Sequence, residues 1–190
     1  MKLSILVCTL PQRFEQYEEL RYNLLEQMGD YSEQVELLTD DHQTDTIGTK
    51  RNRLLKEASG EYVCFIDDDD DVSSSYIRTI MEALHANPGV DCCSLRGVIT
   101  WDGARPEIFE HSVTYHAYKT NDSPEAHVKY ERFPNHLNTI KSSIAKKFSF
   151  PEVNHGEDTD WATQIHLTGK IKTEAYIDKV LYHYLFIPNK

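Results

Sequence analysis

The stretch EYVCFIDDDDDVSSSYI, residues 61–77, decides the fold and points to a function. A run of β-branched and aromatic residues passes directly into five consecutive aspartates, residues 67–71. Carboxylates a few ångströms apart repel each other by about 1 kcal/mol in water and by about 4 kcal/mol at an effective dielectric constant of about 20. Something must offset this repulsion, and water could do so, as could a bound metal ion.

Strands and helices alternate on both sides of the aspartate run. Apolar runs predict strands, and apolar residues at helical spacing predict helices between them. The predicted strands are residues 3–9, 34–40, 62–67 and 90–95, and the predicted helices are residues 14–28, 47–58 and 73–84. This alternation implies an α/β fold with a mainly parallel central sheet and helices on both faces. The aspartate run then lies at the carboxyl end of the third strand.

The second half of the chain is less regular and predicts a more antiparallel arrangement. Its expected elements are a hairpin closed by the Asp-Gly pair at 102–103, a loop over 119–135, helices beginning near Ser142 and Gly156, and strands within 175–186. Two-residue Asp-Gly turns are typical of hairpins. We predict one domain over residues 1–190, with 1–100 and 101–190 as its two halves.

Length and composition exclude several classes of protein. The chain has 190 residues, of which 39% are hydrophobic, and this suits a domain with its own core. No stretch approaches the roughly 18 apolar residues of a membrane span. The N-terminal run MKLSILVCTL reads as a buried strand and not as a signal peptide, so we expect a cytoplasmic protein. The four cysteines lie in apolar runs and are expected to be buried free thiols.

The net charge of −11 falls mostly within residues 1–100, which argues against non-specific binding of nucleic acid. The aspartate run itself allows two interpretations. In an extended segment Asp67, Asp69 and Asp71 would point to one side, as hard oxygen ligands for Mg²⁺ or Mn²⁺. The alternative is a solvated acidic turn, in which Asp71 interacts only with the dipole of the next helix. Ligands of open parallel sheets bind at the carboxyl ends of the strands, so we favour the metal site.

Five stretches together resemble family 2 glycosyltransferases, which have the GT-A fold. In GTKRNRLLKEASGEYVCFIDDDDDVSSSYI the resemblance is carried by a basic-Asn helix start, A-x-G-[DE]-Y, an apolar strand and D-x-D-D. The other four keep the family's order, and they are LSILVCTLPQR, ELLTDDHQTD, FPEVNHGEDTDWATQIHLTG and KVLYHYL. A D-x-D motif alone is a weak signal, whereas five pieces in order are specific. The resemblance covers about residues 3–100 and 133–186 and leaves residues 101–132 unmatched.

The resemblance implies a single GT-A-like (Rossmann-like) domain that moves one sugar, with inversion, from a nucleotide-diphosphate-sugar to an acceptor hydroxyl. A UDP-sugar is favoured as the donor. Residues 1–100 would bind the nucleotide sugar, and residues 101–190 would bind the acceptor. Carried over by position, the donor-binding residues would be Thr9, Pro11, Arg13, Asp40, Lys50, Arg51, Asn52, Asp67, Asp68 and His136.

Within this set the roles implied by the resemblance differ. Thr9, Pro11 and Arg13 would flank the nucleotide, and Asp40 would bind the base, most simply the imide of a uracil. Residues 50–52 lie where the family contacts ribose or diphosphate, and a charge-assisted contact from Lys or Arg suits a phosphate. The alternative for Lys50 and Arg51 is a solvated helix face.

The resemblance also assigns the metal ligands. Asp67, Asp68 and Asp69 align with the D-x-D, so that Asp67 would face the ribose and the water shell of the metal and Asp69 would bind the metal. Five identical side chains leave this register uncertain by one residue. His183 lies where several relatives have a further metal ligand, although it could also be a hydrogen-bonded strand histidine. A nitrogen ligand beside carboxylates would favour Mn²⁺ over Mg²⁺.

The segment GEDTDW, residues 156–161, supplies the candidate base. Displacement at an anomeric carbon needs a cation to take up charge on the departing diphosphate and a base to accept the proton of the attacking hydroxyl. By its position in the motif Asp158 is the predicted base, with Glu157 beside it in the acceptor or sugar pocket. The alternative is that these acids merely lie at a helix N-terminus. His136 would line the sugar pocket.

The chain departs from the family in two respects. It lacks an R-W signature after the E-D helix, and no transmembrane helix follows, so we expect a single transfer and not processive polymerisation. The acceptor stays open among a glycan, a lipid-linked saccharide, a protein and a modified nucleobase, and the oligomeric state is equally open. Two other classes remain as alternatives. One is a haloacid-dehalogenase-like phosphohydrolase, whose D-x-D-x-[TV] motif fits Asp68, Asp70 and Val72, and the other is a non-catalytic divalent-ion or nucleotide-binding module.

Overall fold

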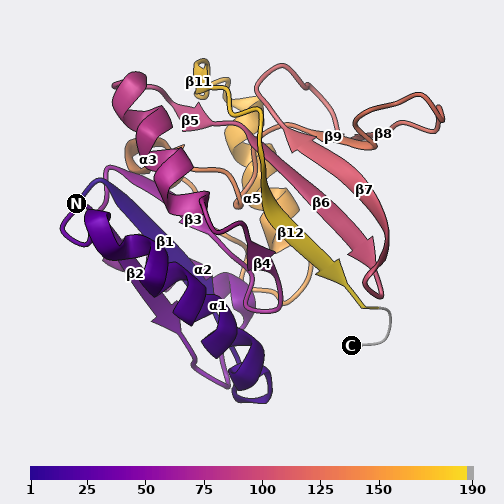
Figure 1. Cartoon of the computed structure of the whole chain (residues 1–190). Helices are drawn as coiled ribbons and strands as arrows, with labels where there is room; N and C mark the ends of the chain where they lie inside the picture. The colour runs from indigo at the N-terminus through magenta and orange to yellow at the C-terminus, as the bar shows by residue number, and fades with distance from the viewer. Residues whose placement is uncertain (188–190) are drawn as a thin grey trace.

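A sheet built on the first three strands forms the centre of the molecule (Figure 1). The computed structural model describes residues 1–187. The strands of this sheet are β1 (Leu3–Cys8), β2 (Val35–Asp40), β3 (Tyr62–Phe65), β5 (Cys92–Cys93), β10 (Ile140–Lys141) and β11 (Glu174–Ala175). β1 pairs in parallel with β2 and with β3, and β10 then joins β3 to β5 through antiparallel pairs. Within the described residues the strand order is β11-β5-β10-β3-β1-β2.

A second sheet lies beside the first and comes mostly from the later half of the chain (Figure 1). Its strands are β4 (Asp71–Val72), β6 (Leu95–Trp101), β7 (Ala104–His111), β8 (Lys119–Thr120), β9 (Tyr130–Arg132) and β12 (Val180–Phe186). The β6–β7 hairpin turns at Asp102 and Gly103, whose φ angles of 52° and 72° are those that a two-residue turn requires. β12 pairs with both β4 and β6, so the last strand lies next to the aspartate run.

Helices cover both faces of the first sheet, as the sequence predicts. They are α1 (Phe14–Met28), α2 (Ile47–Glu57), α3 (Tyr76–Ala86), α4 (Ser142–Ala145) and α5 (Glu157–Leu167), with short 3₁₀ helices at Pro11–Arg13 and Gly29–Tyr31. Side chains alternate along β1, so Leu3 and Ile5 join the core under α1 and α3. Leu6 joins the opposite core, under α2, α4 and α5. The first sheet is therefore packed against helices on both faces, and this holds the ends of its strands in place.

The predicted fold class is confirmed, with three differences in detail. The strand predicted at 90–95 is split into β5 and β6, which belong to different sheets. β10 separates β3 from β5, and its pairing joins residues 140–141 to residues 62–63, which no local pattern can show. The predicted loop at 119–135 contains the short strands β8 and β9. These elements are held by long-range pairing and not by their own periodicity.

The cysteines are free thiols, as predicted, and Cys64, Cys92 and Cys93 are buried while Cys8 is half-buried. Burial raises the pKa of the Cys64 thiol to about 11, so this side chain behaves as an apolar group. In the part of the chain that the structure describes, no helix has the length and hydrophobicity to cross a bilayer.

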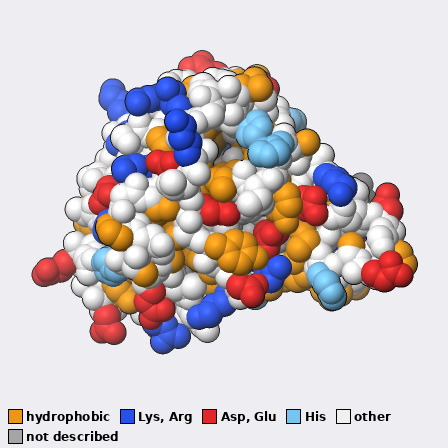
Figure 2. All heavy atoms as spheres, turned by 90° about the horizontal axis from the view of Figure 1, so that it is seen from above, with side chains coloured by type: hydrophobic (Ala, Val, Ile, Leu, Met, Phe, Trp, Pro, Cys, Tyr) orange, Lys and Arg blue, Asp and Glu red, His pale blue; other side chains and the backbone are white. Residues whose placement is uncertain are grey.

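Charges of both signs share the surface that Figure 2 shows, where a group of Lys and Arg side chains gathers near one edge and acidic side chains are scattered. The net charge of −11 is therefore not spread over this surface as one acidic face.

Candidate active site

A cavity of about 450 Å³ opens at the carboxyl ends of β1 and β3. We call it the first cavity. Its lining includes Thr9, Arg13, Lys50, Arg51 and the aspartates 67–70. Ligands of open α/β sheets bind at this edge, where strand ends leave polar groups exposed. The sequence thus places the aspartate run where a ligand can reach it.

The aspartate run does not continue as an extended strand. The backbone N–H of Asp70 donates to the carbonyl of Asp67 over 3.2 Å, which closes a turn. The expected alternation of Asp67, Asp69 and Asp71 on one side is therefore wrong. Each of the five carboxylates has its own partners.

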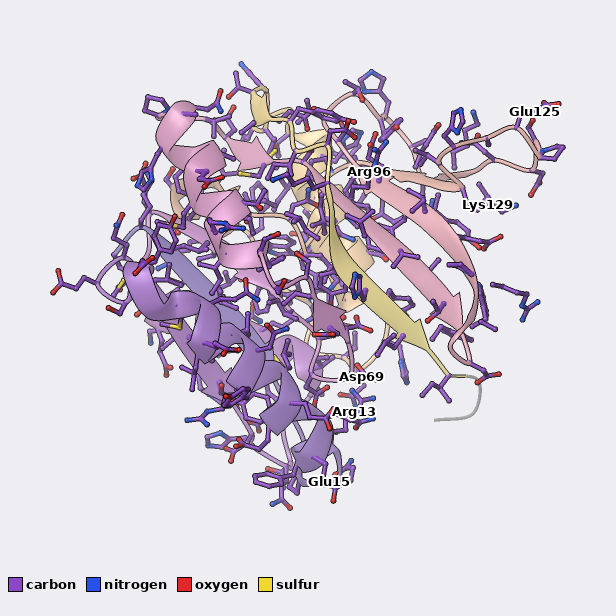
Figure 3. All side chains as sticks on the ribbon, viewed as in Figure 1. Arg13, Glu15, Asp69, Arg96, Glu125 and Lys129 are labelled. Carbon is purple, nitrogen blue, oxygen red and sulfur yellow. The ribbon has the colours of Figure 1, made fainter. Side chains whose placement is uncertain are left out.

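Two arginines balance the first three aspartates. Arg13 lies 2.8 Å from Asp68 and 3.2 Å from Asp69, and Figure 3 shows Arg13 and Asp69 near each other at one end of the sheet. Burial lowers the pKa of Arg13, but its contacts with Asp68 and Asp69 outweigh that effect and raise the pKa. The protein's own arginine therefore offsets part of the negative charge of the aspartate run.

Arg51 joins the end of β3 to the start of α5. Its guanidinium lies 2.9 Å from the Asp67 carboxylate and 3.2 Å from Glu157, and it stacks over Phe65 and Phe150 at 5.5 Å from each ring. Burial would raise the pKa of Asp67, but the charge of Arg51 and the contact with His136 outweigh it and hold the pKa well below its usual range. Asp67 is therefore a fixed anion.

Asp70 and Asp71 have structural surroundings. Asp70 is buried and accepts hydrogen bonds from the Tyr182 hydroxyl at 2.8 Å and from the Leu185 N–H at 2.9 Å. Burial and the charge of Asp67 raise the pKa of Asp70 well above its ordinary value. Asp71 accepts from Asn23 at 3.1 Å and lies at the surface. These two carboxylates attach the run to β12 and α1.

Glu157 and Asp158 open α5, and the chain turns into this helix at Gly156. Gly156 has φ 80°, a left-handed conformation that favours glycine. Glu157 is buried against Arg51, whereas Asp158 is about one-third exposed. The two neighbouring carboxylates therefore have different tasks, one in the framework and one at a cavity wall.

His136 lies between the aspartate run and α5. Its Nε2 is 3.6 Å from Asp67, and its Nδ1 is 3.7 Å from Asp158. The ring is buried, and within residues 1–187 neither ring nitrogen has a hydrogen-bond partner at normal length. His136 thus spans the gap between the first candidate metal ligand and the candidate base.

A second cavity, of about 390 Å³, adjoins the first one. Asp67 and Tyr184 line both cavities. Asp158 and His136 line the second cavity together with aromatic side chains of the second sheet. A ligand in the first cavity and a ligand in the second cavity would therefore meet beside Asp67.

Several residues predicted at the donor site lie elsewhere or have other partners. Pro11 is exposed and does not line the first cavity. The Asp40 carboxylate is buried against Arg53 and accepts from the His42 N–H at 3.1 Å. The Asn52 amide is held by the backbone of Phe150, donating to its carbonyl at 2.9 Å and accepting from its N–H at 2.8 Å.

Lys50 and Thr9 do line the first cavity, but they also bind each other. The Lys50 ammonium donates to the Thr9 carbonyl at 2.8 Å and is almost fully buried, so the alternative of a solvated helix face is wrong for Lys50 and for the equally buried Arg51. His183 pairs in register with Asp71 and lines neither cavity. Its role as a metal ligand stays a prediction without geometric support.

Sequence reasoning missed several residues of the site. Tyr184 separates the two cavities, and burial raises the pKa of its hydroxyl to about 12. Asp45 and Asn154 line the first cavity from loops. Tyr184 follows His183 on β12, so the two side chains point to opposite faces of the strand. This alternation is the sequence signal that could have identified Tyr184 as a site residue.

The fit to a divalent cation can be judged from the side chains present. Asp67 and Asp69 offer hard oxygen ligands at the first cavity, with side chains 27% and 22% exposed. Among the described residues no group of three or more His, Cys, Asp or Glu side chains forms a complete metal site. The protein thus offers two carboxylate ligands at this cavity, and a cation there would need its other ligands from outside the protein.

The model of a protein family described as "Glycosyl transferase family 2" matches residues 21–148 of this chain. No curated protein sequence matches the chain.

The fold is similar to that of S. aureus TarS. The structure of TarS 1–349 has a TM-score of 0.63 at 16% identity, over 97% of this chain and 60% of that one. The same fragment in complex with UDP-GlcNAc has a TM-score of 0.61 at 15% identity, over 100% of this chain and 60% of that one. A longer TarS structure has a TM-score of 0.59 at 16% identity, over 98% of this chain and 37% of that one. The chain thus spans 60% or less of the length of these structures. The match over residues 21–148 is more than half of the sequence, and the chain belongs to glycosyl transferase family 2.

Proposed function

We propose that this protein is a metal-dependent, inverting glycosyltransferase that moves one sugar from a nucleotide-diphosphate-sugar to an acceptor hydroxyl. The observation that carries the proposal is the pair of adjoining cavities, with the D-x-D aspartates in the first and Asp158 in the second. A leaving diphosphate and an attacking hydroxyl need separate places that meet at one carbon atom, and the shared wall at Asp67 and Tyr184 provides that meeting point.

The first cavity is the donor site. Its volume of about 450 Å³ lies in the range of small-ligand sites, about 300–1,000 Å³. Support for a UDP-sugar comes from the fold, since S. aureus TarS 1–349 has this fold and is described in complex with UDP-GlcNAc and with UDP. Asn154 and His155 also line this cavity, so both halves of the chain contribute to donor binding.

Asp67 and Asp69 would hold the divalent cation. When bound there, the cation would neutralise charge on the departing diphosphate. Arg13 lies beside Asp69 and supplies a second, permanent positive charge at the same place. The preference for Mn²⁺ over Mg²⁺ rested on a nitrogen ligand from His183, which lines neither cavity, so both ions belong in the test.

Asp158 would accept the proton of the acceptor hydroxyl. It is partly exposed in the second cavity, and the buried His136 lies 3.7 Å from it. Attack from the second cavity on a sugar held in the first one would displace the diphosphate from the opposite side, which inverts the anomeric configuration.

The phosphohydrolase alternative has no support in the site. It requires a free aspartate nucleophile at Asp68 and a second aspartate at Asp70. Asp68 is buried and paired with Arg13, and Asp70 is buried against Tyr182. The non-catalytic module remains distinguishable only by turnover.

The proposal is tested with a panel of nucleotide sugars. Thermal shift and release of the free nucleotide are measured for UDP-, GDP- and dTDP-sugars with Mn²⁺, with Mg²⁺ and with EDTA. We expect one donor to raise the melting temperature and to be hydrolysed slowly, both only when the metal is present. Binding without any turnover, with or without saccharide acceptors, would favour the non-catalytic module instead.

A further inference from the structure

The second cavity has an unusual wall for a protein of net charge −11. Five aromatic rings line it, and they are Trp101, Phe109, Tyr118, Tyr130 and Tyr184. One basic side chain that is permanently charged, Arg132, lies among them. These residues come mostly from 101–132, the part of the chain without resemblance to the family.

Arg132 is held in place by aromatic rings and by backbone carbonyls. Its guanidinium lies 4.8 Å from the ring centre of Tyr118 and 5.5 Å from that of Tyr130. Its Nη1 donates to the carbonyls of Lys119 and Glu131, both at 2.9 Å. The planar group is therefore oriented before any ligand arrives, and orientation in advance reduces the entropy cost of binding.

Arg132 differs from the other buried or half-buried arginines in its lack of a carboxylate partner among the described residues. Arg13, Arg21, Arg51, Arg53 and Arg96 each form an ion pair with a carboxylate. Within residues 1–187 no carboxylate forms such a pair with Arg132. The side chain of the adjacent Glu131 is directed to Lys119 and Asn121 instead.

Burial lowers the pKa of Arg132 below its usual value, and the neighbouring Tyr118 and Tyr130 offset only part of that effect. Even with this lowered pKa, the arginine side chain stays protonated in a protein. A partly desolvated cation without a carboxylate partner is costly, and it gains most from an anionic ligand. The cavity also contains Asp67 and Asp158, so an anionic group is repelled from the base and drawn to Arg132.

We propose that the acceptor is an anionic saccharide, whose carboxylate or phosphate binds Arg132 while its ring lies against the aromatic wall. This inference rests on the proposed glycosyl transfer and names the acceptor class for it. The pairing of a fixed guanidinium with an anionic oxygen group sets which end of the acceptor enters, and thereby which hydroxyl reaches Asp158. Planar, two-point recognition of carboxylate or phosphate is the specific capacity of arginine.

The test compares sugars that differ only in charge. Glucose, glucuronate and glucose 6-phosphate form one set, and galactose, galacturonate and galactose 6-phosphate form a second. Each is added to the protein with the active donor, and transfer is measured together with thermal shift in the presence of UDP and metal. We expect at least one anionic sugar to exceed its neutral parent about tenfold in kcat/KM or in apparent affinity. The carboxylate and phosphate arms show which group is preferred.

The variant Arg132→Gln should remove that preference, so that kcat/KM for the anionic sugar falls to about the value for its neutral parent. Arg132→Lys keeps the charge without the planar fork and should retain part of the preference. The matched control is Arg105→Gln, because Arg105 is an exposed arginine on the neighbouring strand β7. If Arg132→Gln fails to fold, the preference of the parent protein must still fall as ionic strength rises, because charge attraction is screened by salt.

Neutral and anionic sugars that bind equally well would overturn the inference, and so would a lack of response to every anionic sugar. Either result with donor hydrolysis intact leaves the proposed function standing. Loss of donor binding and hydrolysis in the parent protein would instead contradict the proposed function itself. The two failures are therefore distinguishable in one set of measurements.

Discussion

The Arg51 guanidinium lies 2.9 Å from the Asp67 carboxylate, and both come from segments that the fold brings together under the first cavity. The same guanidinium reaches Glu157 at 3.2 Å. One buried cation thus fixes the position of the D-x-D relative to the helix that carries the candidate base. The relationship makes Arg51 part of the framework, whereas its position in the sequence suggested a contact with ribose or diphosphate.

Replacing Arg51 with leucine should destabilise the protein strongly. The change leaves Asp67 and Glu157 as buried or half-buried anions without their cation, and removal of one partner of a buried ion pair costs about 3–5 kcal/mol. The free energy of unfolding is measured by urea titration. Arg21→Leu is the control, since Arg21 pairs with Glu18 at the surface and should cost less than about 1 kcal/mol. Similar losses in both variants would contradict the framework role.

Asn52 offers a second test of whether a predicted donor-site residue stabilises the fold or binds the donor. Its amide satisfies both the N–H and the carbonyl of Phe150, so Asn52→Ala should lower the free energy of unfolding by about 1–3 kcal/mol. The KM for the donor should stay within about twofold of the parent value, because Asn52 does not line the first cavity. Steady-state kinetics and urea unfolding are compared on the same preparation. A large rise in KM with unchanged stability would return Asn52 to the donor site.

The position of the site could be predicted from the sequence, because it depends on strand order. An apolar strand that ends in aspartates, within alternating strands and helices, places the acids at the carboxyl edge of a sheet. The structure has Asp67, Asp68 and Asp69 at that edge, beside Thr9 and Arg13 from the first strand end. Local pattern and topology carry this information together.

The partner of each side chain could not be predicted in the same way. Whether Arg51 meets a phosphate or Asp67 depends on how α2 packs against the sheet, and no local sequence pattern shows this. The contact between His136 and Asp158 joins a loop to a helix start 22 residues later in the sequence. The aromatic wall with Arg132 lies on strands whose pairing is set by neighbours and not by their own sequence.

The register of the D-x-D is open to a direct test. Asp68 is buried and paired with Arg13, whereas Asp69 is partly exposed in the first cavity. Asp69→Asn should therefore lower metal-dependent donor binding about tenfold or more, with a small loss of stability. Asp68→Asn should mainly reduce stability, because it removes the buried half of the contact with Arg13. The two variants are distinguished by titrating the metal ion at a fixed concentration of donor. Equal metal affinity in the parent protein and in Asp69→Asn would show that Asp69 is not a metal ligand.

Asp158→Asn should abolish transfer and leave the donor site intact. The amide keeps the shape of the carboxylate but cannot accept the proton, so kcat for transfer should fall about 100-fold or more. Thermal shift with the donor should not change, because Asp158 does not line the first cavity. Asp160→Asn is the control, since Asp160 is an exposed acid in the same first turn of α5. Unchanged transfer in Asp158→Asn would exclude this residue as the base.

His111 predicts how stability depends on pH. Burial lowers its pKa to about 3, and the hydrogen bond with Asn138 at 3.1 Å offsets only part of that effect. The native state therefore keeps His111 neutral while the unfolded chain takes up a proton below about pH 6.5, so this residue's stabilisation is present above pH 6.5 and is lost as the pH falls toward 3. Its contribution to the slope is up to about 1.4 kcal/mol per pH unit. In His111→Gln the free energy of unfolding, measured from pH 7 to pH 4, should fall less steeply than in the parent, whereas the exposed His127→Gln should follow the parent curve. Parallel curves for all three proteins would show that folding does not lower the pKa of His111.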